Sequence, residues 1–132
     1  MSGKDTDRRL DRTGAGIDCA QAREAVRAAL SGAETDPGWT EDVLTAVTEL
    51  VSNARRHAGG VTAFRADVQA GGIVVAVSDG SRAVPRTAAW APSEPGGFGW
   101  IVVNRLADTT DVQVNPDGKT ITAGFTAPRA HV

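Results

Sequence analysis

The chain has 132 residues, of which 41% are hydrophobic and 23% charged, so it fits one compact domain with a hydrophobic core. Its formal net charge of −2 excludes the overall basic field that binders of nucleic acid or anionic membranes usually carry. The single cysteine, Cys19, excludes an internal disulfide framework and a cysteine-rich zinc site. No apolar run reaches the roughly 18 residues of a membrane span. The polar N-terminus lacks the apolar stretch of a signal peptide, so we expect a cytoplasmic protein.

The two ends of the chain differ in composition from its middle. Residues 1–16 are charged and contain glycine, which is typical of a disordered tail. Residues 127–132 form a second short and polar tail. We therefore expect one folded domain, over residues 17–126, between these two tails.

Two helices are expected in the first half of that domain. Asp18 is a favourable N-cap for a helix over residues 19–30, and Gly32 ends that helix. Thr40 is the expected N-cap of a second helix. Apolar residues at spacings of three and four continue this helix as far as Gly59–Gly60, where the pair of glycines stops it.

After the second helix the hydrophobic pattern changes from helical to alternating. Residues 61–68 and 73–77 predict a hairpin, and the continuous apolar run of its second strand predicts burial. A loop rich in glycine and proline follows over residues 79–99, and a loop of that length in a small domain is usually functional. A third helix over residues 100–107 and a second hairpin over residues 111–125 complete the pattern.

The expected order of elements is helix, helix, strand, strand, loop, helix, strand, strand. Hairpin connections make the paired strands antiparallel, and the helices can bury their apolar stripes against one face of the sheet. The sequence therefore predicts an α+β fold. It is a two-layer sandwich with a mainly antiparallel sheet of about four strands and three helices on one face.

The second helix carries an acid, an amide and an imidazole at steps of four residues. Glu49, Asn53 and His57 therefore lie on nearly one face, beside the apolar stripe. An amide oxygen can bind a hard cation, so this set suits Mg²⁺ on phosphates, with Glu49 orienting or deprotonating a nucleophile. The alternative, which the helix alone favours, is a solvated polar face with His57 interacting with the helix C-terminus.

Motifs that contain glycine stand at three further places. Asp79 and Gly80 follow the buried strand, where a carboxylate can meet a donor such as an adenine amino group, although Asp-Gly is also ordinary in turns. Gly97 and Gly99 precede the third helix, where a close backbone approach and helix N-terminal amides suit phosphate. Residues 118–120, Gly-Lys-Thr, are typical of a turn. Each motif is weak alone, but their order along the chain is specific.

In this order the motifs resemble those of the histidine-kinase-like ATPase superfamily, which has the Bergerat fold. ELVSNARRHA at residues 49–58 resembles the N box, VSDGS at 77–81 the first G box, GGFGW at 96–100 the second and GKT at 118–120 the third. The resemblance covers about residues 17–126. The small size and the sequence GGFGWIVVNRLAD are similar to one branch, the bacterial anti-sigma factors that are also serine/threonine protein kinases.

The resemblance implies that ATP and Mg²⁺ are the cofactors and assigns roles to the matching residues. Asn53 would bind Mg²⁺, and Glu49 would be the catalytic base or the carboxylate that orients water. Asp79, followed by Gly80, would bind the adenine amino group, and Thr120 would help through a water molecule.

Four other positions match the family pattern. Gly97 and Gly99 would let the loop and the third helix close over the phosphates. His57 belongs to the N box and counts among the nucleotide-binding residues, although no firm role follows for it. Arg23, on the first helix, matches the arginine with which this branch contacts its protein partners.

The resemblance implies an ATP-binding anti-sigma factor that sequesters a sigma factor. It would phosphorylate a serine or threonine of a STAS-type anti-sigma-factor antagonist, with no direct contact to nucleic acid or membrane. The alternative is a non-catalytic partner-switching module that binds nucleotide, or none, and acts through its protein surfaces. Members of the branch begin with an edge strand that helps to form a homodimer. Residues 8–16, RRLDRTGAG, are a poor strand, so the sequence leaves a homodimer open.

Overall fold

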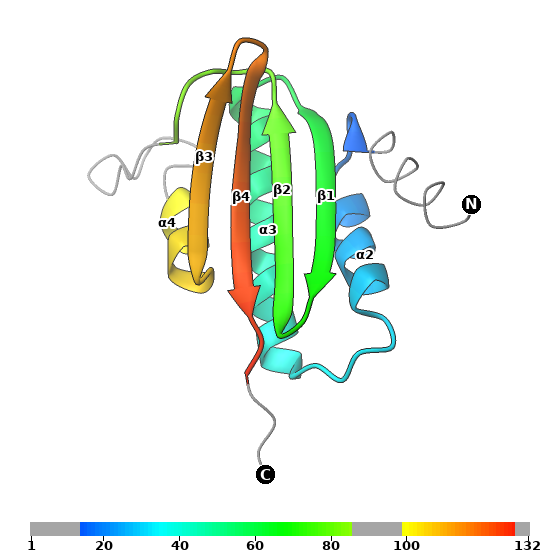
Figure 1. The fold of residues 1–132 in the computed structure, drawn as a ribbon. Helices are drawn as coiled ribbons and strands as arrows, with labels where there is room; N and C mark the ends of the chain where they lie inside the picture. The colour runs from blue at the N-terminus through cyan, green and yellow to red at the C-terminus, as the bar shows by residue number, and fades with distance from the viewer. Residues whose placement is uncertain (1–13, 86–98, 129–132) are drawn as a thin grey trace.

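The computed structural model describes residues 14–85 and 99–128 (Figure 1). The strands within these ranges form one antiparallel sheet in the order β1-β2-β4-β3, and the helices α2, α3 and α4 all lie on one face of it (Figure 1). The predicted α+β two-layer sandwich is therefore confirmed. The elements in chain order are α2 (Cys19–Leu30), α3 (Pro37–His57), β1 (Val61–Gln69), β2 (Gly72–Asp79), α4 (Gly99–Leu106), β3 (Thr109–Asn115) and β4 (Gly118–Thr126).

Helix α2 begins and ends at the residues that the sequence predicts. The Asp18 side chain accepts a hydrogen bond from the Gln21 amide at 2.8 Å, and the Gln21 side chain accepts one from the Asp18 amide at 3.0 Å. This capping box satisfies two amide groups that the helix itself leaves without a partner. Ala22, Val26 and Leu30, four residues apart, are buried and form the inner face of the helix.

Helix α3 begins earlier than predicted, and Thr40 is not its N-cap. The cap is Asp36, whose side chain accepts a hydrogen bond from the Trp39 amide at 2.9 Å. Pro37 occupies the start of the helix, where its missing amide costs nothing because no helical carbonyl would have accepted from it. Thr40 lies inside the helix, and its hydroxyl is bonded to the Thr35 hydroxyl at 3.0 Å.

The hydrophobic core lies between the helices and the inner face of the sheet. Alternate residues of β2, namely Ile73, Val75 and Val77, are buried there, as the period of two in a strand requires. Helix α3 is the central helix and lies between α2 and α4 (Figure 1). Its buried residues are Val43, Leu44, Ala46, Val47, Leu50, Val51 and Ala54.

Several elements meet at one end of the domain. Asp79, the last residue of β2, pairs with Val61 at the start of β1 and with Lys119 near the start of β4. Helix α3 ends there too, because only residues 58–60 separate it from Val61. The Gly60 amide closes this link by donating to the Ala54 carbonyl at 2.9 Å.

The described chain starts within the predicted N-terminal tail. Gly16 donates its amide to the Val61 carbonyl at 2.7 Å, and a Cβ added to Gly14 would overlap the Phe64 amide nitrogen. Residues 14–16 therefore contact β1. Most of both predicted tails, residues 1–13 and 129–132, lies outside the described residues. Over residues 14–85 and 99–128, none of the helices combines the length and hydropathy needed to cross a bilayer.

Candidate functional site

The start of α4 lies against two polar side chains of α3. A Cβ added to Gly99 would lie 2.7 Å from Glu49 Oε1, 3.2 Å from Asn53 Oδ1 and 3.3 Å from Asn53 Nδ2. A Cβ at Gly99 would make the end of the Glu49 side chain move, whereas glycine leaves room for both side chains where they lie. The structure therefore brings together the acid, the amide and the second-G-box glycine that the sequence singles out.

Asn53 has a buried polar atom that lacks a hydrogen-bond partner in the part of the chain that the structure describes. No described residue satisfies its Oδ1, and no other buried side-chain nitrogen or oxygen in the described ranges is left in this state. A buried acceptor without a partner costs about 1–3 kcal/mol. Such atoms in native structures call for an explanation such as an ion or a water. An amide oxygen beside a carboxylate is a donor set that Mg²⁺ accepts, so Asn53 and Glu49 fit this metal.

A metal ion here would depend on its ligand for most of its coordination. Within the described ranges, no three histidine, cysteine or acidic side chains cluster closely enough to form a metal site. Mg²⁺ is usually held by one or two protein oxygens together with phosphates and waters rather than by a full protein cage. The sparse donor set at Asn53 is therefore appropriate for a metal that arrives with a polyphosphate.

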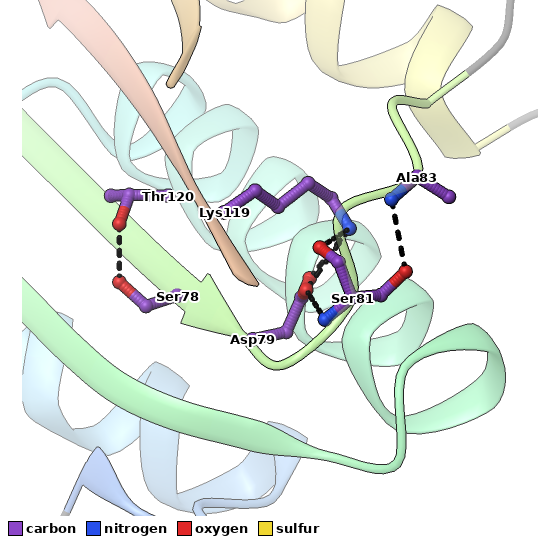
Figure 2. Close-up of polar contacts among 6 residues, drawn as sticks. All are labelled: Ser78, Asp79, Ser81, Ala83, Lys119 and Thr120. Carbon is purple, nitrogen blue, oxygen red and sulfur yellow. Dashed lines mark hydrogen bonds and ion pairs between the residues drawn. The ribbon is translucent and has the colours of Figure 1, made fainter. Parts of the chain in front are cut away.

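Asp79 and Lys119 form a buried ion pair at the end of β2 (Figure 2). The lysine Nζ lies 3.0 Å from Asp79 Oδ1 and 3.0 Å from Asp79 Oδ2. The side chain of Asp79 is 4% exposed and that of Lys119 is 8% exposed. The Ser81 amide donates a further hydrogen bond to Asp79 Oδ1 at 2.9 Å, and Lys119 also donates to the Ser81 carbonyl at 3.4 Å. Both oxygens of the carboxylate are thus engaged within the chain itself.

The register of the sheet places Lys119 beside Asp79. The two residues are direct partners in the pairing of β2 with β4, and both are buried on the inner face. Gly118 makes this close approach possible, because a Cβ there would overlap the Asp79 carbonyl oxygen and its φ of 151° suits glycine. Sequence reasoning missed Lys119. The sequence does contain a signal for it: Lys119 alternates with the buried Ile121 and Ala123 at a spacing of two, so it lies on the same face of the strand.

Thr120 lies on the opposite face of the sheet from the Asp79 carboxylate. It pairs with Ser78, and the two hydroxyl oxygens are 2.7 Å apart (Figure 2). The expectation that Thr120 shares a site with Asp79 is therefore corrected, because consecutive residues of a strand point to opposite faces.

The remaining predicted site residues are dispersed. Gly80 follows Asp79 and is exposed, His57 is the exposed last residue of α3, and Arg23 is half-buried on α2. Gly97 lies outside the described residues. The roles predicted for these four residues remain predictions.

Comparisons with known proteins show the family of the chain. Residues 16–125 match the model of the histidine kinase-like ATPase domain. The chain belongs to this family. No curated protein sequence matches it significantly.

Two solved structures, both of the blue-light activated histidine kinase of Erythrobacter litoralis EL346, share the fold of this histidine kinase-like ATPase domain. The first has 20% identity and a TM-score of 0.55, and the match covers 81% of this chain and 40% of that one. The second, described as the histidine kinase domain, has 22% identity and a TM-score of 0.53, with coverage of 82% and 60%. This chain therefore spans less than two thirds of either relative, and the likeness concerns the fold.

Membership in an ATPase family implies a nucleotide, and the two ends of the predicted site differ in how well they fit one. The Asn53 and Glu49 end fits a metal-bound polyphosphate, because a buried oxygen there has no partner within residues 14–85 and 99–128. At the other end, Asp79 already holds an ammonium group, so it is not free in the way an adenine-binding carboxylate would be.

Proposed function

We propose that this protein binds Mg²⁺-ATP beside α3 and α4 and acts as an anti-sigma factor that phosphorylates its antagonist. The main support is the Asn53 side chain, whose buried oxygen has no partner among the described residues and lies beside Glu49 at the start of α4. The family supports nucleotide binding. The resemblance of residues 96–108 to the anti-sigma kinases supports the finer assignment.

In this proposal Asn53 would hold Mg²⁺, and the bound metal would neutralise charge on the phosphates. Glu49 takes the proton from a serine or threonine hydroxyl of the antagonist. The hydroxyl oxygen bonds to the γ-phosphorus while the bond to the β–γ bridging oxygen breaks, leaving ADP. Gly99, in the first turn of α4, lies against both side chains, and amide groups of that turn would bind the phosphates.

The proposed partners are a sigma factor and a STAS-type antagonist, with Arg23 as a contact residue. Helix α2, which carries Arg23, lies on the side of α3 opposite to α4 (Figure 1). In this proposal, partner capture and nucleotide binding use different helices, so different substitutions should affect each of them.

The experiment that tests this proposal is phosphate transfer from radiolabelled ATP to the cognate antagonist. Glu49→Gln keeps the shape of the side chain but cannot take a proton, so we expect transfer to fall by about 10²-fold or more. Arg23→Ala tests the partner contact separately, since it should weaken capture of the sigma factor while leaving the affinity for Mg²⁺-ATP unchanged. Equal transfer by wild type and Glu49→Gln would remove Glu49 from the catalytic role.

One observation favours a second candidate, a partner-switching module without catalysis. The Asp79 carboxylate is engaged by Lys119 and Ser81, which weakens the case for tight adenine binding. Calorimetry distinguishes the two candidates. Absence of binding at millimolar Mg²⁺-ATP would leave the module that acts through protein surfaces alone.

A further inference from the structure

The last turn of α3 carries two exposed arginines, Arg55 and Arg56, and the proposed chemistry uses neither of them. We propose that Arg56 binds an acidic side chain of the protein that receives the phosphate. The site would then prefer a serine or threonine that has an acidic residue nearby in the same chain. This inference rests on the proposed function and concerns which protein substrate that site accepts.

Arg56 lies on the same face of α3 as the two polar side chains of the candidate site. It follows Glu49 by seven positions and Asn53 by three, which is the i, i+4, i+7 spacing of one helix face. At about 100° per residue, Arg56 is about 20° from Glu49 around the helix axis. The rise of about 1.5 Å per residue places it about 10 Å beyond Glu49 along the axis. Arg56 therefore lies one turn past Asn53, at the end of this face.

The Arg56 guanidinium has no counter-ion in the part of the chain that the structure describes. None of the ion pairs formed within residues 14–85 and 99–128 includes it. The acids of α3 other than Glu49 are Glu41 and Asp42, which lie near the start of the helix, about 20 Å away along the axis. That separation exceeds the Debye length of about 8–10 Å, so these acids do not neutralise Arg56. The described chain therefore leaves this cation for a ligand.

A guanidinium binds carboxylate and phosphate groups, and the position of Arg56 favours a carboxylate of the protein substrate. In the proposed site the phosphates would be held by the metal ion and by the first turn of α4, where Gly99 lies against Glu49 and Asn53. Arg56 lies beyond that contact and is exposed, so it is accessible to a protein that approaches α3 from solvent. The net charge of −2 gives no general attraction for an acidic chain, so a local cation would provide it.

The spacing along α3 also predicts where the acidic residue stands in the substrate. The hydroxyl that is phosphorylated has to reach Glu49, and Arg56 is about 10 Å farther along the axis. An extended chain advances about 3.3–3.6 Å per residue, so about three residues cover that distance. We therefore expect an aspartate or glutamate about three residues from the phosphorylated serine or threonine.

Arg55 provides a matched control for Arg56. It is also exposed and lies in the same turn, so both arginines interact favourably with the C-terminal end of the helix dipole. Arg55 lies about 120° from Glu49 around the axis, which places it away from the face of the site. The two arginines are therefore equivalent for the stability of α3, and they differ for a substrate bound at Glu49.

The test measures transfer of phosphate from radiolabelled ATP to the cognate antagonist at increasing antagonist concentration. Arg56→Gln should raise KM for the antagonist about tenfold, the loss expected for a charged hydrogen bond, and leave kcat unchanged. Calorimetry should give this variant a dissociation constant for Mg²⁺-ATP within about twofold of wild type. Arg55→Gln should match the wild type in KM, kcat and affinity for Mg²⁺-ATP. Arg56→Glu should recover transfer when the acidic residue of the antagonist is replaced by lysine.

The outcomes separate this inference from the proposed function. An unchanged KM in Arg56→Gln, or an equal rise in both variants, overturns the role of Arg56 and leaves the transfer reaction intact. A weaker affinity for Mg²⁺-ATP with an unchanged KM for the antagonist assigns Arg56 to the nucleotide and overturns this inference too. Absence of transfer by the wild type refutes the proposed function and this inference with it.

Discussion

The two ends of the candidate site differ in how their buried polar atoms are satisfied. Where α4 begins, Asn53 Oδ1 is buried without a partner among the described residues, next to Glu49. Where β2 ends, every oxygen of the Asp79 carboxylate has a partner within the chain. The buried oxygen at the first end lowers the stability of the protein alone and would gain a partner from the proposed ligand, whereas the carboxylate at the second end has its partners before any ligand binds.

This contrast has a consequence for mutagenesis. Removing a polar group that has all its hydrogen-bond partners should destabilise the protein. Removing a group that lacks a partner should not destabilise the protein, even if that group contributes more to nucleotide binding. Stability and nucleotide affinity should therefore respond in opposite ways at the two ends.

The largest effect is expected for Asp79→Ala. This change leaves the Lys119 ammonium group buried without its counter-ion, which should lower the free energy of unfolding by about 3–5 kcal/mol. Urea denaturation followed by circular dichroism measures the loss. The double variant Asp79→Asn with Lys119→Met removes both charges and should recover most of it. A loss below about 1 kcal/mol in the single variant would show that the pair does not anchor the sheet.

The next largest effect is expected for Gly118→Ala. The added Cβ would overlap the Asp79 carbonyl oxygen, and alanine is strained at a φ of 151°, so we expect a cost of about 2–3 kcal/mol. Gly80→Ala is the matched control, because the space around Gly80 is open, and it should stay within about 0.5 kcal/mol of wild type. Equal costs for the two glycines would contradict the close contact between β2 and β4.

The opposite sign is expected for Asn53→Ala. Loss of an unsatisfied buried oxygen and the higher helix propensity of alanine should raise the free energy of unfolding by up to about 1 kcal/mol. The same change should abolish the increase in melting temperature that Mg²⁺-ATP produces. Ser52→Ala, one residue earlier on α3, loses a 3.3 Å contact with Cys19 Sγ and should keep that increase. An Asn53→Ala variant that is less stable than wild type, but whose melting temperature still rises with Mg²⁺-ATP, would contradict the assignment of Asn53 to the metal site.

The smallest effect is expected for Thr120→Val. The change removes the hydrogen bond with Ser78 on the outer face of the sheet and should cost about 1 kcal/mol or less. Affinity for Mg²⁺-ATP should remain unchanged, because Thr120 does not reach the Asp79 carboxylate. Ser78→Ala should show a similar loss of stability and no additional loss when combined with Thr120→Val. A marked loss of affinity in calorimetry would return Thr120 to the nucleotide site.

The features that sequence predicts well are those set by neighbours along the chain. The limits of α2 and its Asp18 cap follow from a capping box over residues 18–21 and an apolar stripe with period 3.6. The shared face of Glu49 and Asn53 likewise follows from a helical step of four residues. The start of α3 is the local feature that was predicted wrongly, because Asp36 and Thr40 are both acceptable caps and the Asp36–Pro37 pair is the stronger of the two.

By itself, the sequence determined the order of the elements, the two-layer α+β fold and the alignment of the acid and amide on α3. These depend on periodicities and turn residues that each segment carries within itself. Only the tertiary structure decided that Lys119, rather than Thr120, faces Asp79 and that the start of α4 lies against Glu49 and Asn53. The physical reason is that a shift of one residue in strand register exchanges the two faces of β4, and register results from pairing segments distant in the chain.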